Sequence, residues 1–258
     1  MPEGDTIHYA ASLIRPVLEG HVPDAIETPH PRFGADRWPE RLAGRVVESV
    51  HTHGKHLFLR FDGDLTIHSH LRMTGSWGVH EAGRRWKRGA WRAWLIVRRA
   101  GTAVVQFDGP LLELLAEPRR RFDSRLAQLG PDILAPELDT REFVRRLRHD
   151  DPTRPIGDAL LDQRTIAGIG NLWKAEGCFL AGIDPWRPVD RVSDDEAVRI
   201  VELTRPRMQQ SSSDGRQDRH RVVYGAAGRP CPRCGTMIRQ RGQGDDNRAT
   251  FWCPGCQT

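Results

Sequence analysis

Four cysteines crowd the C-terminal end of this 258-residue chain, and their spacing strongly limits what that segment can fold into. They form two C-x2-C pairs, Cys231 with Cys234 and Cys253 with Cys256, and eighteen residues separate the pairs. Each pair can bind one ion, and two pairs complete a tetrahedral shell of four thiolates. A closed shell without an open position favours one structural Zn²⁺ over an iron–sulfur cluster. Because so short a segment has little core, we expect the metal to hold it folded.

The charge of the chain indicates a polyanionic partner. The formal net charge is +5, and most of the excess is arginine, with runs at residues 84–85, 119–121 and 145–146. The planar guanidinium suits phosphate, although a solvated basic surface would leave the same signature. With 38% hydrophobic residues the chain can form packed cores. It has no long apolar run and a polar start, so we expect a cytoplasmic protein that neither crosses nor binds a membrane.

Three regions differ in their hydrophobic period. Residues 1–125 begin with a helical pattern capped by Asp5 and kinked or ended at Pro16, and an antiparallel sandwich is predicted to follow. Its predicted strands are 45–50, 56–61, 65–70, 93–98 and 102–108. Residues 136–212 have a helical period, and 211–215 are predicted to be a mobile linker. Residues 222–258 contain the cysteines, so the fold class is a multidomain α+β chain.

The start of the chain offers a nucleophile. A small second residue normally allows the initiator Met1 to be removed, which would leave Pro2 as a secondary amine. An α-amino group titrates near neutrality, so part of it is unprotonated and nucleophilic. Attack on a sugar C1′ would give an iminium cation that labilises the neighbouring proton, and Glu3 could carry that proton. In isolation, a Met-Pro-Glu start is common and carries no function.

Four motifs taken together resemble the formamidopyrimidine-DNA glycosylase / endonuclease VIII family over the whole chain and in the same order. They are Pro2-Glu3-Gly4, Gly54-Lys55 before a strand, Gly168-Ile169-Gly170-Asn171 before a helix, and Asn247-Arg248-Ala249-Thr250-Phe251 in the four-cysteine hairpin. The resemblance implies an N-terminal sandwich, a helix-two-turn-helix domain and a zinc ribbon. It also implies a base-excision repair enzyme that cuts double-stranded DNA at an oxidised base or abasic site, acts as a monomer and associates with the nucleoid through DNA.

The resemblance assigns roles to matching residues. Pro2 is the implied Schiff-base nucleophile, Glu3 the proton shuttle and Lys55 the lysine that contacts phosphate beside the damaged nucleoside. The implied DNA-binding residues are His70, Met73, Arg120, Asn171, Glu176 and Arg248. Among them Asn171 and Arg248 clamp phosphates, and Met73 fills the vacated stack with help from Arg120 or Phe122. Asn171 could also cap the following helix, which is compatible with a phosphate contact, whereas a core position for Met73 competes with the void-filling role.

The chain departs from the family pattern directly after Gly4. Many relatives have a Pro-Glu pair there, and this chain has Asp5-Thr6, so a second carboxylate is missing at Thr6 unless Asp5 serves instead. The resemblance therefore implies the lyase step more directly than the assistance to base release. Gly4 and the short connection over 209–222 favour the endonuclease VIII branch and therefore oxidised pyrimidines.

Two other hypotheses come from different classes of protein. A non-catalytic DNA-binding protein would keep Lys55, Asn171 and Arg248 but would form no imine with DNA. A metalloenzyme could use the histidines at 51, 53, 56, 68 and 70, although no carboxylate is convincingly placed with them.

Overall fold

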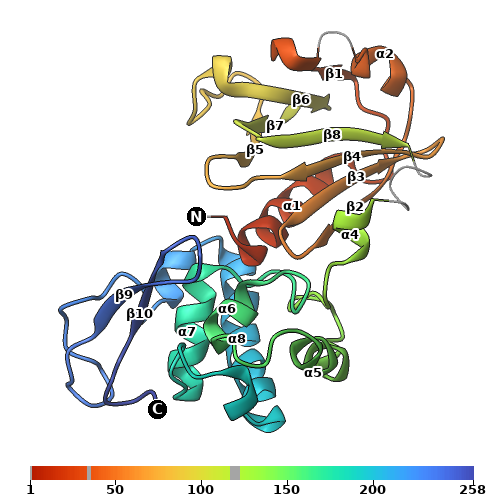
Figure 1. The fold of residues 1–258 in the computed structure, drawn as a ribbon. Coiled ribbons are helices and arrows are strands. Elements are labelled where there is room, and N and C mark those ends of the chain that lie inside the picture. Colours follow the sequence, from red (N-terminus) through yellow and green to blue (C-terminus); the bar gives the residue numbers. More distant parts are fainter. Residues whose placement is uncertain (1, 34–35, 117–122) are drawn as a thin grey trace. The chain divides into compact units, whose positions relative to one another are not determined.

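The computed structural model describes residues 2–33, 36–116 and 123–258 (Figure 1). Its contacts divide the chain into two compact units. The first contains Pro2 and Thr6–Ala127, and the second contains Glu3–Asp5 and Gln128–Thr258. The peptide link between Pro2 and Glu3 is therefore a boundary, and each unit is described by itself below.

Two antiparallel four-stranded sheets form the first unit. One has the order β2 (Val47–His53), β3 (His56–Phe61), β4 (Leu65–His70) and β8 (Leu111–Ala116). The other has the order β1 (Ala25–Glu27), β6 (Ala93–Arg99), β7 (Thr102–Phe107) and β5 (Ser76–Glu81). Short helical turns complete the unit: η1 (Pro31–Phe33), α2 (Trp38–Leu42), η2 (Ala90–Arg92) and α4 (Ser124–Ala127).

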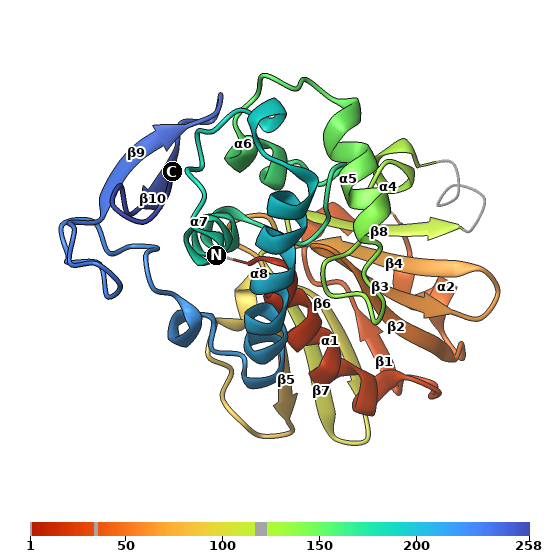
Figure 2. The same ribbon diagram turned by 90° about the horizontal axis from the view of Figure 1, so that it is seen from below.

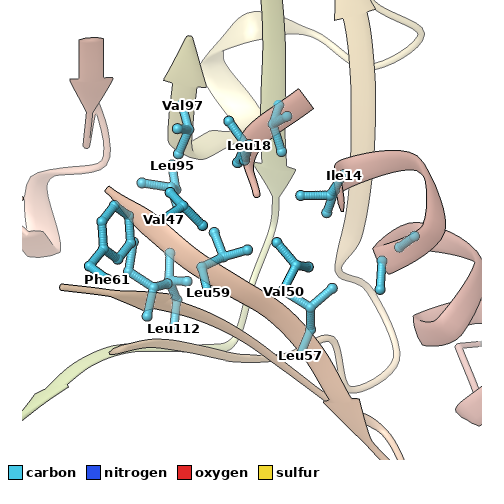
Figure 3. Packing of buried hydrophobic residues seen from close by; sticks show 14 of the residues in the cluster. Ile14, Leu18, Val47, Val50, Leu57, Leu59, Phe61, Leu95, Val97 and Leu112 are labelled. Atoms are coloured by element: carbon cyan, nitrogen blue, oxygen red, sulfur yellow. The ribbon is translucent and has the colours of Figure 1, made fainter. Parts of the chain in front are cut away.

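The core of this unit collects side chains from both sheets and from the first helix, α1 (Gly4–Leu18). On the helix, Ile7, Ala11, Ile14 and Leu18 recur at the spacing of one helical face, and all four are buried. Figure 3 shows Ile14 and Leu18 beside strand residues such as Leu59 and Val97. Burial of these apolar side chains supplies the driving force that holds the layers together.

The bounds 56–61 and 65–70 of two predicted strands are confirmed, and β1, β5 and β8 were not predicted. β1 is only three residues long, β5 is half-buried along most of its length, and the Leu-rich β8 has no strict alternation. The cap at Asp5 was wrong, since α1 begins at Gly4, and Pro16 lies inside the helix, which continues to Leu18.

Helices and one hairpin form the second unit. The helices are α5 (Thr140–His149), α6 (Ile156–Leu161), α7 (Asn171–Ala181) and α8 (Asp194–Asp214), with short turns η3 (Val189–Arg191) and η4 (Gln217–His220). Strands β9 (Arg239–Gln243) and β10 (Arg248–Trp252) form the hairpin. α7 packs against both α8 and β10 (Figure 2). Its residues are buried from Asn171 to Phe179, so α7 is the central helix of this unit.

The predicted linker at 211–215 was wrong. α8 ends at Asp214, and the residue that caps it, Gly215, has a φ of +67° that fits a helix C-terminus. Serine clusters favour loops locally, but here Ser211 is buried and its hydroxyl donates to Asp5. A tertiary contact therefore extends the helix past its weak local signal. Within the described parts of the chain, no helix is long and apolar enough to span a membrane.

Candidate active site and metal centre

Glu3 binds the start of α7. Its carboxylate accepts hydrogen bonds from the backbone N–H groups of Gly170 at 3.0 Å, Leu172 at 2.9 Å and Trp173 at 3.3 Å. The first amides of a helix have no partner within the helix, and the helix dipole favours a negative charge there. Glu3 is 1% exposed, so this contact is an internal part of the second unit. It fixes the residue that follows Pro2.

Three glycines make this approach feasible. A Cβ on Gly170 would lie 2.3 Å from the carboxyl carbon of Glu3, and a Cβ on Gly4 would lie 2.9 Å from the Cα of Gly168. The Gly4 amide also donates to the Gly168 carbonyl at 2.9 Å, and Gly168 has a φ of +105° that L side chains rarely adopt. The glycines of both sequence motifs therefore serve one junction. The motif predicted an approach to phosphate, and in the structure the Glu3 carboxylate takes these amides.

Asp5 is the second buried carboxylate of the N-terminal segment. It is 1% exposed, and it accepts hydrogen bonds from the hydroxyl of Ser211 at 2.5 Å and from the side-chain amide of Gln217 at 3.0 Å. These donors lie in the last turn of α8 and in η4. No pattern in the sequence indicates that Ser211 and Gln217 contact Asp5, because more than 200 residues separate each of them from it.

Asn171 is the first residue of α7, and its side chain points to the hairpin. Its Nδ2 donates to the Ala249 carbonyl at 2.7 Å, while its buried Oδ1 has no hydrogen-bond partner in the described parts of the chain. The residue at the N-cap of α7 is Gly170, and no side chain caps the helix there. The predicted cap by Asn171 was therefore wrong. Arg248, at the start of β10, is 46% exposed at its side chain and pairs with Asp246 at 2.6 Å. Because Asn171 binds Ala249 and Arg248 precedes Ala249 on β10, Asn171 and Arg248 lie in one region of the second unit.

A buried lysine lies behind this region. Lys174 is fully buried, and its ammonium donates to Thr250 and, at 3.1 Å, to Gln243. Gln243 in turn donates to the Pro185 carbonyl at 2.7 Å. Burial lowers the pKa of Lys174 to about 8. The sequence analysis did not predict a role for Lys174. The only indication of its burial is that the helix around it has no polar face.

Glu176 lies two residues further along α7 and is also buried. Its Oε1 accepts from the backbone N–H groups of Val222, Val223 and Tyr224 at 2.8–2.9 Å. Burial raises its pKa. The side chain is 0% exposed, and its hydrogen bonds hold the segment that leads to the cysteines. The predicted contact of Glu176 with DNA stays a prediction.

In the first unit, Lys55 and His70 lie close together. Lys55 follows Gly54 in the turn between β2 and β3, and His70 ends β4 opposite His56. Burial, together with the charges of Arg72 and Lys55, lowers the pKa of His70 to about 4. His70 is therefore neutral at pH 7, and its Nδ1 accepts from the Arg72 amide at 3.1 Å. Its remaining ring nitrogen is then a donor.

Met73 follows in the turn after β4 and is 68% exposed. The competing core position for Met73 was therefore wrong. Arg120 and Phe122, the other predicted void-filling residues, lie outside the described residues.

The four cysteine side chains converge as predicted. All four Sγ atoms lie within 4.8 Å of one another, and three Sγ–Sγ distances are 3.3, 3.5 and 3.8 Å. Zn–S bonds of about 2.3 Å in a tetrahedron require sulfurs about 3.8 Å apart, so the set fits such an ion. Cys178 lies apart from them, fully buried in the helical core, and burial raises its pKa to about 12.

The histidine-rich strands do not form a second metal site. Among the described residues, the four cysteines are the only group of three or more potential ligands close enough to hold an ion. His51, Phe58 and His68 instead stack in a column, with ring centroids 4.8 Å apart in each pair. His56 and His68 share a hydrogen bond of 2.8 Å, and burial lowers the pKa of His56 to about 2. Packing therefore accounts for these rings.

Comparison with known proteins supports the same identification. The profile of the Formamidopyrimidine-DNA glycosylase N-terminal domain matches residues 1–111, and that of the Formamidopyrimidine-DNA glycosylase H2TH domain matches residues 129–218. A probable endonuclease 8 2 of Streptomyces coelicolor is 41% identical over 100% of this chain and 94% of that protein. The DNA-(apurinic or apyrimidinic site) lyase Nei2 of Mycolicibacterium smegmatis is 38% identical over 100% of this chain and 99% of that protein.

Solved structures agree on the fold. Lactococcus lactis Fpg (MutM), in a complex with DNA containing N7-benzyl-Fapy-dG, superposes with a TM-score of 0.85 at 23% identity, covering 100% of both chains. A sandwich with a leading helix, a helical domain and a four-cysteine hairpin define the helix-two-turn-helix class of DNA glycosylases. The chain belongs to the formamidopyrimidine-DNA glycosylase family. Within it the endonuclease 8 2 and Nei2 relatives, at 41% and 38% identity, are more similar than a formamidopyrimidine-DNA glycosylase of Moorella thermoacetica, at 31% identity.

The predicted family, its endonuclease VIII branch and the fold class are thereby confirmed. The enzyme class of the family, a DNA glycosylase and lyase of DNA repair, is confirmed with them.

Proposed function

We propose that this protein excises oxidised bases, pyrimidines above all, from double-stranded DNA and then cuts the strand through a Schiff base on Pro2. The observation that carries the proposal is the anchoring of Glu3. Three backbone amides hold the carboxylate of Glu3, the residue directly after Pro2. The terminal amine of Pro2 is therefore one residue away from a fixed carboxylate. Precise placement of a nucleophile and a proton carrier is a large part of what catalysis requires.

The reaction begins with the unprotonated nitrogen of Pro2. Its lone pair forms a bond to C1′, the bond from C1′ to the base breaks, and the proton that the nitrogen loses passes to the leaving base. The nitrogen lone pair then breaks the C1′–O4′ bond, O4′ takes a proton from the solvent, and the resulting iminium withdraws electrons from C2′. Loss of a C2′ proton to Glu3 expels the 3′ phosphate, and a second elimination expels the 5′ phosphate. Water then hydrolyses the iminium and regenerates the amine, leaving a one-nucleotide gap with phosphate at both ends.

The remaining residues bind the DNA backbone. We assign phosphate contacts to Lys55 and His70 in the first unit and to Asn171 and Arg248 in the second. The target nucleotide must leave the stack before C1′ is accessible, and exposed Met73 would fill the space that it vacates. Asp5 is assigned no contact with DNA, and its buried carboxylate, which accepts from Ser211 and Gln217, instead ties the N-terminal segment to α8 and η4.

The domain division and the metal belong to the same proposal. We assign a catalytic sandwich domain to residues 1–125, a DNA-binding helical domain to 136–212 and a zinc ribbon to 222–258, acting as a monomer. Cys231, Cys234, Cys253 and Cys256 would hold one Zn²⁺, which supports the hairpin and takes no part in the chemistry.

Nicking of defined-lesion duplexes tests the proposal. Wild type with its N-terminus confirmed as Pro2 is expected to cut abasic and oxidised-pyrimidine duplexes and to be trapped covalently on abasic DNA by borohydride. Pro2→Gly should lose most of the nicking, and Asn171→Ala should weaken duplex binding without preventing the trap at saturating DNA. Failure of confirmed wild type to trap would favour a binding protein without catalysis, and equal nicking by Pro2→Gly would remove Pro2 from the mechanism.

A further inference from the structure

The segment Arg84–Arg92, which joins β5 to β6 (yellow in Figure 1), has no role in the function proposed above. Its sequence is RRWKRGAWR, with five cations, two tryptophans and no acidic residue. We call it the Arg–Trp loop. Cations interleaved with aromatic rings are the composition of surfaces that bind nucleic acid, although a solvated charged loop would have the same cations.

The base of the loop is firmly anchored to the sandwich. The Trp86 ring packs against His80 and Phe107, with centroids 5.7 Å away in both cases, and joins a small apolar cluster. Arg88 and Arg92 both pair with Asp108 at 2.6 Å. These two pairs hold the pKa of Asp108 below its usual range, against the effect of its burial. One tryptophan and two arginines are thus used to fix the loop.

The other members of the loop are displayed to solvent. Trp91 is 84% exposed, more than any other large apolar side chain among the described residues. Arg85 and Lys87 form no ion pair with any residue that the structure describes, and Arg84 has only Glu81 at 3.7 Å. Gly89 leaves room for the indole, since a Cβ there would lie 2.6 Å from the Trp91 Nε1. The Trp91 ring has the Arg92 guanidinium 5.7 Å from its centroid, and the exposed Arg85 and Lys87 lie in the same short loop. An exposed indole in a loop of this charge is the combination that binds the bases and phosphates of a single strand.

The loop also lies next to the turn that displays Met73. Arg88 donates to the Thr74 carbonyl at 2.9 Å, in addition to its pair with Asp108. Arg88 therefore ties the Arg–Trp loop to the residue directly after Met73. Arg88 thus connects the two segments that carry the exposed apolar side chains Met73 and Trp91.

We propose that the Arg–Trp loop is a second nucleic-acid contact, at which an unpaired base stacks on Trp91 while its flanking phosphates pair with Arg85 and Lys87. The inference rests on the proposed function for the presence of DNA. A single strand alternates phosphates with flat rings, which matches the alternation of cations and indole in the loop. An acidic peptide would neutralise the cations but would leave the indole in water.

The stacking half of the proposal is tested with a short oligothymidylate and the full-length protein, by fluorescence anisotropy. Trp91→Ala should weaken binding about tenfold, the size expected when one base–aromatic stack is lost. Trp91→Phe should keep most of the affinity, whereas Trp91→Leu should lose as much as the alanine variant. Leu13→Ala, which truncates another exposed apolar side chain, is the matched control and should bind as wild type does.

The charge half is tested by salt dependence. Each phosphate contact on a single strand contributes about 0.7 to the slope of log K against log salt, so Arg85→Gln with Lys87→Gln should lower the slope by about 1.4. Arg32→Gln with Arg41→Gln removes the same charge from another exposed part of the first unit and should leave the slope nearly unchanged.

Two results would overturn the proposal. One is a Trp91→Ala protein that binds oligothymidylate as tightly as wild type. The other is displacement of the oligonucleotide by poly-glutamate at equal charge as effectively as by unlabelled oligonucleotide, which would indicate an acidic protein partner. Borohydride trapping on a paired abasic duplex runs beside both. Trapping by wild type together with unchanged Trp91→Ala binding would reject the loop contact alone, and absence of trapping would reject the proposed function.

Discussion

The carboxylate of Glu3 accepts a hydrogen bond of 3.0 Å from the backbone amide of Gly170, 167 residues away in the chain. This contact joins the Pro-Glu-Gly and Gly-x-Gly-Asn motifs, which are far apart in the sequence. It explains physically why each motif needs glycine, because the backbone at both positions approaches without space for a side chain.

Gly170→Ala is therefore expected to clash with Glu3 and to destabilise the protein by about 1–3 kcal/mol, the usual cost of overpacking. In a Glu3→Ala background most of that cost should disappear, since the clashing carboxylate is gone. Urea unfolding of the four proteins in this double-mutant cycle measures the coupling. Equal costs in both backgrounds would show that the two residues do not meet.

Asp5 is expected to act as a positioning residue for the N-terminal segment. Ser211→Ala removes one of its donors and should lower kcat for abasic-site cleavage about threefold with little change in KM, because DNA binding is untouched. Asp5→Ala should lower kcat further, and Asp5→Glu should restore part of it. Ser212→Ala, which removes an exposed hydroxyl of the same helix, is the control. A rise in KM alone would contradict a positioning role.

Because Lys174 is buried, we expect the free energy of unfolding to rise at alkaline pH. Burial lowers its pKa from 10.5 to about 8, so between these values the unfolded chain binds more protons than the folded one. The free energy of unfolding should then increase with pH across this window, by on the order of 1–3 kcal/mol. Lys174→Met, which keeps the length of the side chain, should abolish the increase. Chemical denaturation at pH 8, 9 and 10 provides the measurement, and a fall in stability for wild type alone would refute it.

The buried histidines predict a loss of stability in acid. Burial lowers the pKa of His56 to about 2 and that of His70 to about 4. When the pH falls below 6.5, both histidines therefore take up a proton in the unfolded chain while they stay neutral in the folded one. Their contribution is present above pH 6.5 and is lost as the pH falls, by up to about 1.4 kcal/mol per pH unit for each group. Thermal melts from pH 7 to 4.5 should show a shallower decline for His56→Gln. The exposed His149→Gln should follow wild type.

Metal analysis should find about one zinc per chain. Cys234→Ser is expected to release it, to loosen the hairpin that carries Arg248 and to weaken duplex binding at least tenfold. Cys178→Ala removes a buried thiol outside the cluster and should retain the zinc. Brief exposure to EDTA that leaves the zinc in place should leave nicking unchanged, because no catalytic step uses the metal. Full zinc content in Cys234→Ser would contradict the assignment of the site.

The sequence by itself determined the local features of this protein. Apolar segments bounded by Gly and Asp turns predicted β3 and β4, spacing predicted the four-thiolate cluster, and the ordered motifs identified the family. These features depend on neighbours along the chain or on short repeats, which periodicity records directly.

Only the tertiary structure decided what the buried polar groups do. In it Glu3 accepts hydrogen bonds from the amides at the start of α7, Asp5 accepts from Ser211 and Gln217, and Glu176 accepts from the backbone at 222–224. It also extended α8 through a serine cluster that favours a loop. Each outcome depends on a hydrogen bond between residues at least 46 positions apart, and a buried polar group must find such a partner wherever the fold supplies one.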